Sequence, residues 1–288
     1  MLFIGIDLGT SACKLLLVGE DGTIQNEVTK EYPLSFPHPG WAEQRPEEWW
    51  DAVVTGVPEL LRGFDANDVA GIGSGGQMHG LVALDEHDHV IRPAILWNDG
   101  RTFKEVEYLN NVVGKDRLSE LTANIAFAGF TAPKLLWMRE NEPENFKKIA
   151  KIMLPKDYLT YKLTGVHACD YSDASGMLLL DVQHKRWSQE MLEICGVSER
   201  QMPKLFESFA VVGSRRKRRR RWGCLRRSRS WPVQATTLRR RSARVRSAQA
   251  GAISRSARPA RSSFRPTNLA STRTMRFMPL RTQTAAII

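Results

Sequence analysis

The stretch Gly5–Lys14, "GIDLGTSACK", decides the fold. The apolar segment "LFIGIDLG" predicts a buried strand, and "CKLLLVGE" predicts its partner across a tight turn. Backbone N–H groups in a Gly-Thr-Ser turn such as Gly9–Ser11 converge and can hold phosphate oxygens. Asp7 beside them can hold a hydrated Mg²⁺, which prefers carboxylate, water and phosphate ligands. The alternative is an ordinary hairpin with a capping aspartate, and no GK[ST] follows as in a Walker P-loop.

The segments around this stretch predict an α/β layered domain. Asp21-Gly22 marks a second hairpin turn, so the chain opens with a three-stranded antiparallel meander. Residues 45–64 predict a helix with Pro46 in its first turn, and "VAGIGSGG" (69–76) predicts a strand ending in glycines. Further expectations are a hairpin over 80–97, a helix over 101–114, a helix that starts at Pro133, and a strand leading into a helix that stops at Gly165. Strands alternating with helices are typical of α/β folds.

The net charge of +11 hides a sharp division of the chain. Residues 1–214 carry 20 basic and 31 acidic residues, whereas residues 215–288 carry 22 basic and no acidic residues. The change falls within the stretch "GSRRKRRRRWGCLRRSRSW", which starts at Gly213, and the second segment has few apolar residues. It cannot offset the entropy of ordering, so we expect residues 1–214 to fold and residues 215–288 to be disordered.

The N-terminus and the cysteines exclude several classes of protein. No basic residue precedes the first apolar stretch, which Asp7 interrupts, so we expect no signal peptide and a cytoplasmic protein. No apolar run is long enough for a membrane span. Cys13, Cys169, Cys195 and Cys224 lack metal-site spacing, which favours free thiols in a reducing compartment.

Polar residues that follow strand ends are candidates for binding a small polar molecule. Gln77, Met78 and His79 follow the glycine-rich strand; His79 can exchange hydrogen bonds with a hydroxyl and Met78 can lie against carbon. The alternative for His79 is a structural histidine. Asp99 either binds a ligand or caps the next helix, and Asp173 in "YSDASG" either binds a ligand or caps a turn.

Six further segments indicate which family the chain resembles. They are "HPGWAEQRPEEWW" (38–50), "GQMHG" (76–80), "ILWNDGRT" (95–102), "GFTAPKLLW" (129–137), "LPKDYL" (154–159) and "SDASGMLLLD" (172–181). Together with Asp-Leu-Gly-Thr-Ser, their order over residues 2–214 resembles the FGGY family of carbohydrate kinases. That family belongs to the actin-like, ribonuclease H-like ATPase superfamily. The sequences "GQMHG" and "WNDGRT" are most similar to the corresponding segments of family members that act on ketopentoses.

The resemblance implies an enzyme that transfers the γ-phosphate of ATP, with Mg²⁺, to a ketopentose, most closely D-xylulose to D-xylulose 5-phosphate. Ribulose, gluconate and glycerol are the alternative substrates. It assigns Asp7 to Mg²⁺ and phosphate, and Gly9, Thr10 and Ser11 to the phosphate turn. It assigns Gln77, Met78, His79, Asp99 and Asp173 to the sugar. A homodimer is compatible with the resemblance.

The family also implies a second domain that closes over ATP and a general-base aspartate in a "GGGDN-A-A-G" segment. After Ser214 the chain has no aspartate. DNA that is rich in G and C and encodes many alanines encodes many arginines when it is read one base out of phase. Shifting "WPVQATTLRRRSA" (231–243) by one nucleotide permits V-A-G-P-G-D-N-A-A-A-A-V-G, with the Asp codon straddling Ala235 and Thr236. We therefore expect a frameshift near Ser214 and a truncated, inactive product.

Two other interpretations assume that residues 215–288 are read in the correct frame. A segment with a net charge of +22 would bind RNA or DNA nonspecifically and with strong salt dependence. A noncatalytic actin-like scaffold is the third alternative, although a scaffold has no need of a polyol pocket.

Overall fold

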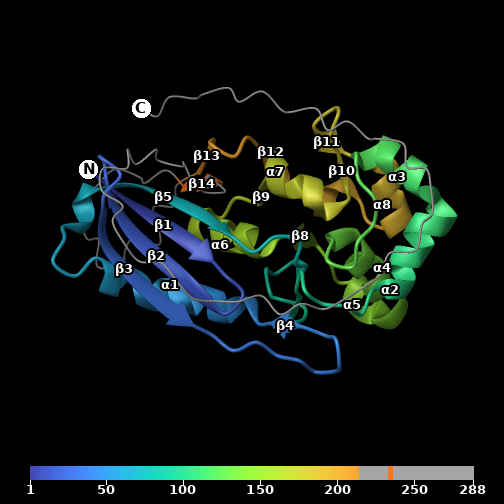
Figure 1. The fold of residues 1–288 in the computed structure, drawn as a ribbon, viewed down its shortest axis with the longest axis horizontal. Coiled ribbons are helices and arrows are strands. Elements are labelled where there is room, and N and C mark those ends of the chain that lie inside the picture. The colour runs from blue at the N-terminus through green and yellow to red at the C-terminus, as the bar shows by residue number, and fades with distance from the viewer. Residues whose placement is uncertain (214–232, 236–288) are drawn as a thin grey trace, which may run out of the picture. The chain divides into compact units, whose positions relative to one another are not determined.

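The computed structural model describes residues 1–213 and 233–235 (Figure 1). All of them belong to one compact unit, Met1–Arg240. The predicted disorder of residues 215–288 lies outside the described residues, apart from Val233–Ala235. These three residues form a strand that the sequence analysis does not predict.

The largest sheet is mixed and has six strands, four of which lie within residues 2–76. Its order is β13-β14-β5-β1-β2-β3. The predicted antiparallel meander of β1, β2 and β3 is confirmed, and β5 pairs with β1 in parallel. The strands are β1 (Leu2–Leu8), β2 (Ala12–Gly19), β3 (Ile24–Glu31), β5 (Val69–Gly76), β13 (Val211–Gly213) and β14 (Val233–Ala235).

Short strand pairs and helices make up the rest of the described chain. The short strands are β4 (Glu43–Gln44), β6 (Val82–Leu84), β7 (Ala94–Ile95), β8 (Lys151–Met153), β9 (Ala168–Asp170), β10 (Leu180–Asp181), β11 (Arg186–Trp187) and β12 (Lys204–Phe206). The helices are α1 (Pro46–Leu60), α2 (Phe103–Glu107), α3 (Lys115–Thr122), α4 (Thr131–Asn141), α5 (Pro143–Phe146), α6 (Pro155–Thr164), α7 (Tyr171–Ala174) and α8 (Gln189–Cys195). Single turns of other helix types are η1 (Ala66–Asp68), η2 (Tyr108–Gly114), η3 (Ser175–Met177) and η4 (Glu199–Gln201).

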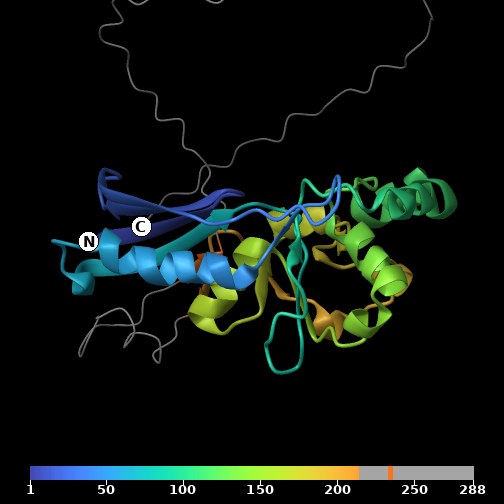
Figure 2. The same cartoon turned by 90° about the horizontal axis from the view of Figure 1, so that it is seen from below.

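The first hydrophobic core lies between the sheet and two helices. Figure 2 shows α1 along one face of β1, β2 and β3. Ile4, Ile6 and Leu8 of β1 face this core, and their alternation with exposed neighbours is the period expected for a strand with one buried face. Leu159 of α6 enters the same core. The free face of the sheet therefore carries the alternate residue of β1, Asp7.

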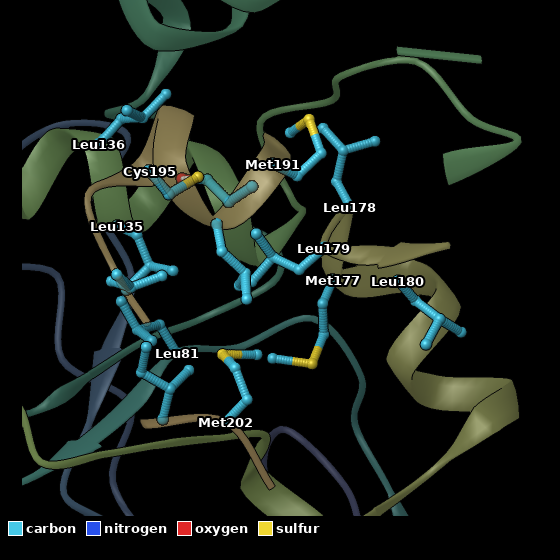
Figure 3. Close-up of a cluster of buried hydrophobic side chains, with 14 of the residues drawn as sticks. Leu81, Leu135, Leu136, Met177, Leu178, Leu179, Leu180, Met191, Cys195 and Met202 are labelled. Carbon is cyan, nitrogen blue, oxygen red and sulfur yellow. Dashed lines mark hydrogen bonds between the residues drawn. The ribbon is translucent and has the colours of Figure 1, made fainter. Parts of the chain in front are cut away.

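The second hydrophobic core is formed by helices, turns and short strands and not by the six-stranded sheet. Figure 3 shows Leu135 of α4, Met177 and Leu179 gathered with their neighbours. All are completely buried, as are Met191 and Cys195 of α8. This core fixes α4 and the turn after α7, two segments that reach the candidate site.

Two expectations differ from the structure in detail. The segment 80–97 is only partly a hairpin, since β6 pairs with β8 and β7 pairs with β4. Only isolated bridges, including Leu81↔Ile95, join its two arms. The helix over 101–114 is broken into α2 and the π-helical turn η2. The predicted helix stop at Gly165 is confirmed, with a φ of 81°.

The described residues also bear on the remaining sequence expectations. Cys13, Cys169 and Cys195 are free and buried. Of the helices in the described part of the chain, none has the length and apolarity needed to cross a bilayer.

We predict that Gly56→Leu destabilises the domain. A Cβ at Gly56 would lie 2.4 Å from Cδ1 of the buried Leu15, so α1 can approach β2 only because this residue has no side chain. Overpacking typically costs about 1–3 kcal/mol. This exceeds the ~1 kcal/mol gained because leucine has a higher helix propensity than glycine. Urea unfolding should therefore give a lower free energy of unfolding.

Thr55→Leu on the exposed side of the same helix is the matched control, with an expected change within about 0.5 kcal/mol. An unfolding free energy for Gly56→Leu equal to that of the control would show that α1 does not pack this closely.

Candidate functional site

The Gly9–Ser11 turn is held by side chains from three other segments. Gly9 N donates to Ala12 O at 3.0 Å, and a Cβ at Gly9 would lie 2.9 Å from the same oxygen, so the turn is tight. The Tyr32 hydroxyl donates to Gly9 O. Gln44 Nε2 donates to Thr10 O at 2.6 Å, and Trp97 Nε1 donates to Thr10 Oγ1 at 3.0 Å. The turn is therefore fixed before any ligand arrives.

Asp7 stands at the end of β1 on the exposed face of the sheet. Burial, and secondarily the charge of Asp7, raise the pKa of the Cys13 thiol to about 12. In the described residues no group of three or more His, Cys, Asp or Glu side chains is arranged to hold a metal. A single exposed carboxylate beside a phosphate turn fits Mg²⁺, which keeps several waters and takes its other ligands from substrate phosphates.

The segment 76–80 begins next to Asp7. In the parallel register Asp7 is level with Gly75, and Gln77 N donates to Leu8 O at 2.7 Å. A Cβ at Gly76 would lie 2.5 Å from Leu8 O, so only glycine allows this approach. The pairing of β1 with β5 thus delivers the two predicted groups of residues to one edge of the sheet.

Gln77 is 8% exposed, and its contact with a sugar stays a prediction. Its Nε2 donates to Gln44 Oε1 at 3.1 Å, and the same oxygen accepts from Trp49 Nε1 at 3.1 Å. Gln44 therefore connects Gln77 to the carbonyl of Thr10. Met78, by contrast, is 38% exposed.

His79 is half-buried, with a left-handed backbone (φ 64°). Its Nδ1 lies 3.0 Å from Gly176 O, and its ring packs on Phe130. Burial lowers the pKa of the ring below its usual value, so the ring is neutral at pH 7. Because a carbonyl only accepts, Nδ1 carries the proton and Nε2 is left as a hydrogen-bond acceptor.

Trp97 also follows a strand end, and the sequence alone favours a core position for it over a place in the site. It follows β7 and is 48% exposed, although its bond to Thr10 fixes the indole. Its backbone is also closely packed, since a Cβ at Gly129 would lie 2.7 Å from Trp97 O. A tryptophan after a strand is usually core, so only its exposure in the fold distinguishes it.

Asp99 is 2% exposed and its carboxylate is fully used by neighbours. Oδ2 accepts from Ala42 N at 2.6 Å, and Arg101 donates to both oxygens, with Nη2 at 2.7 Å from Oδ2. Arg101 also pairs with Glu43 and stacks over the Trp41 ring, 3.7 Å from its centroid. Asp99 thus anchors the segment that carries Trp97, and direct contact with a sugar stays a prediction.

Asp173 is also buried, in a cluster around Lys156. Lys156 Nζ lies 2.9 Å from Asp157, 3.1 Å from Asp173 and 3.7 Å from Asp170. The cluster lies under α7 and η3, whose Gly176 contacts His79. A Cβ on Gly176 would come within 2.2 Å of the His79 ring, so this turn seats the ring. Sugar contact by Asp173 itself stays a prediction.

Comparison with known proteins agrees with this geometry. The N-terminal domain of the FGGY family of carbohydrate kinases matches residues 2–226. The chain is similar to the xylulose kinase of Escherichia coli (strain K12), with 46% identity over 213 residues, 74% of this chain and 44% of that protein. Among solved structures it is similar to a "xyloylose kinase" from Brucella ovis, with a TM-score of 0.77 and 40% identity over 82% of this chain and 48% of the other.

A more distant likeness supports the fold alone. Plasmodium falciparum glycerol kinase with ADP superposes with a TM-score of 0.74 at 21% identity, over 81% of this chain and 47% of the other. The predicted actin-like α/β fold is thus confirmed. The chain spans less than half the length of the curated relatives it matches. It belongs to the FGGY family of carbohydrate kinases, and its matching part is the N-terminal domain of that family.

Proposed function

We propose that residues 1–213 form the sugar-binding half of a kinase that phosphorylates a ketopentose, most closely D-xylulose, in the cytoplasm. The observation that carries this is that the segment of Met78 and His79 starts beside the end of β1, where Gln77 N donates to Leu8 O, and that the Trp97 indole is bonded to Thr10 in the turn that follows β1. The 46% identity to several xylulose kinases supports the choice of sugar over ribulose, gluconate or glycerol.

The chemistry of the exposed groups suits a polyol. His79 Nε2 can accept a hydrogen bond from a sugar hydroxyl, since its Nδ1 proton is already engaged with Gly176 O. Met78 and the Trp97 ring offer apolar surface to the carbon skeleton. Directional acceptors beside apolar surface are typical of small-molecule sites.

The phosphate turn and Asp7 would hold the nucleotide. Kinases of this family use ATP, which supplies the phosphoryl group when bound. The N–H groups of Thr10 and Ser11 would bind phosphate oxygens, and Asp7 would hold Mg²⁺ through water. These residues act by position and charge, which is the main contribution of protein to phosphoryl transfer.

We predict that this chain binds D-xylulose in preference to D-ribulose, glycerol and gluconate, and that His79→Ala weakens the binding. One lost neutral hydrogen bond is worth about 0.5–1.5 kcal/mol, or roughly 2- to 10-fold in the dissociation constant. Titration by ligand-observed NMR measures both. His87→Ala, an exposed histidine in the 86–89 turn, is the control and should leave the affinity unchanged. Equal affinity for all four compounds would reject the assignment of substrate.

We also propose that residues 215–288 are read out of frame and that the chain as written lacks the general base. This segment contains no aspartate, and loss of a base typically costs about 10²–10⁴-fold in rate. The strand β14 supports the proposal. It is parallel to β5, with Ala235 level with Ser74, one residue short of Gly75, which is level with Asp7. The shifted reading puts its aspartate codon at Ala235–Thr236, where this strand ends.

We predict that the DNA around the Ser214 codon has gained or lost one base. Repairing it should give ATP-dependent phosphorylation of D-xylulose, whereas the chain as written should be at least about 10²-fold slower in a coupled ADP-release assay. Early stop codons in the repaired frame, or equal turnover by the unrepaired chain, would refute the frame proposal. In that case the basic segment would need a role of its own. Nonspecific nucleic-acid binding and a homodimer stay predictions.

We predict that Asp173 makes stability fall as the pH rises. Burial raises the pKa of its carboxyl to about 6, although Lys156 opposes the shift. The folded state therefore holds more protons than the unfolded chain between pH ~4 and ~6, and stability falls through that window. Relative to the parent, Asp173→Asn should gain about 1–3 kcal/mol between pH 4 and 7 in urea unfolding.

Asp85→Asn supplies a control of opposite sign. Hydrogen bonds from the backbone N–H groups of His89 and His87 lower the pKa of Asp85, so its contribution is lost as the pH falls. A stability difference for Asp173→Asn that is flat from pH 4 to 7 would contradict the prediction.

A further inference from the structure

Lys134 of α4 is a buried lysine in an unusual setting. It is completely buried, and within the described residues it forms no ion pair. Its Nζ is instead surrounded by backbone carbonyl oxygens. Those of Phe130 and His79 lie at 3.0 and 3.3 Å, that of Ala128 lies at 3.5 Å, and that of Gly129 is also bonded. These carbonyls come from two segments that are far apart in the sequence.

The first of these segments carries His79. Its left-handed backbone, with a φ of 64°, costs an ordinary residue roughly 1–2 kcal/mol. The His79 carbonyl is held by two donors from α4, Thr131 Oγ1 at 3.1 Å and Lys134 Nζ at 3.3 Å. These bonds fix the peptide that follows His79 and so the direction in which its ring leaves the backbone.

The second segment supports Trp97. Lys134 Nζ donates a hydrogen bond to Gly129 O, and the Cα of Gly129 lies so close to Trp97 O that a Cβ would come within 2.7 Å. Phe130 of the same segment packs its ring on that of His79. One ammonium group therefore ties together the backbones behind His79 and Trp97.

Stability alone does not account for a lysine at this position. Burial lowers the pKa of Lys134 to about 7, with Asp99 opposing the shift and Arg101 adding to it. Replacing buried charges by apolar side chains of similar size is often neutral or stabilising. Three donors on one compact nitrogen can, however, bind carbonyls from two loops at once, which an apolar side chain cannot do.

We propose that Lys134, assisted by Thr131, is a positioning residue of the candidate sugar site: it holds the backbones of His79 and Gly129 and so sets the placement of His79 and Trp97. Its effect on sugar affinity rests on the proposed function, whereas its effect on the backbone does not.

The test uses the full chain with Lys134→Met and Thr131→Val, and with Lys148→Met as an exposed lysine control. Circular dichroism verifies folding. NMR then gives two readouts without sugar: the His79 ring resonances and the amide exchange of residues 79–81. We expect shifted ring resonances in both variants. Exchange should be about tenfold faster in Lys134→Met and a few-fold faster in Thr131→Val.

The third readout is the dissociation constant for D-xylulose, which should rise about fivefold or more in Lys134→Met and less in Thr131→Val. Lys148→Met should match the parent in all three. If Lys134→Met does not fold, Thr131→Val carries the test, because it removes a donor from the same carbonyl.

Two results would overturn the proposal. Folded variants whose ring resonances and exchange match the parent would show that the donors do not position His79. A change in Lys134→Met with none in Thr131→Val would show an effect of charge rather than of position. If the backbone readouts change but the parent does not bind D-xylulose, the positioning role stands and the proposed substrate fails.

Discussion

The close parallel pairing of β1 with β5 is the constraint on which the candidate site depends. Gly76 has no side chain, and this lets Gln77 N reach Leu8 O at 2.7 Å. That bond starts the segment of Met78 and His79 beside the end of β1, where Asp7 and the phosphate turn begin. A larger residue at position 76 would separate the two strands where their functional residues diverge. The proposed phosphate and sugar parts of the candidate site therefore share one packing requirement.

Beneath the exposed site lies a layer of buried polar and charged residues. Gln44 joins the phosphate turn to Gln77, the Asp99–Arg101–Glu43 group anchors the segment of Trp97, and Lys134 holds His79. Burying such groups is costly unless they are paired, and apolar residues would fill the same volume more cheaply. Their value lies in direction, since hydrogen bonds fix loop backbones that dispersion forces alone leave free to shift. The two apolar cores stabilise the domain, and this polar layer gives its surface one defined geometry.

The sequence was sufficient to predict most of the fold, because strand alternation and glycine turns are local signals. The meander, α1, β5 and the end of α6 at Gly165 follow from such signals. The pairing of β6 with β8 does not, since it joins residues 67 to 71 positions apart. For the candidate site, the sequence pointed to segments that the fold brings to one edge of the sheet, but it could not rank their side chains by exposure. Asp99 and Asp173 looked like available carboxylates, yet each is buried among cations supplied by the fold.

The change in composition after Ser214 leaves the architecture of the candidate site intact. The side chains that line or support it extend no further along the chain than Gly176 and its turn. The second core that holds this turn is completed by α8 and Met202. Sugar binding by the first 213 residues and the reading frame of the remainder are thus physically separable questions. The described side chains of the two cores come from residues before this change, whereas β14 beyond it lies between β13 and β5 in the sheet, so the proposed sugar site and the proposed loss of the general base call for separate experiments.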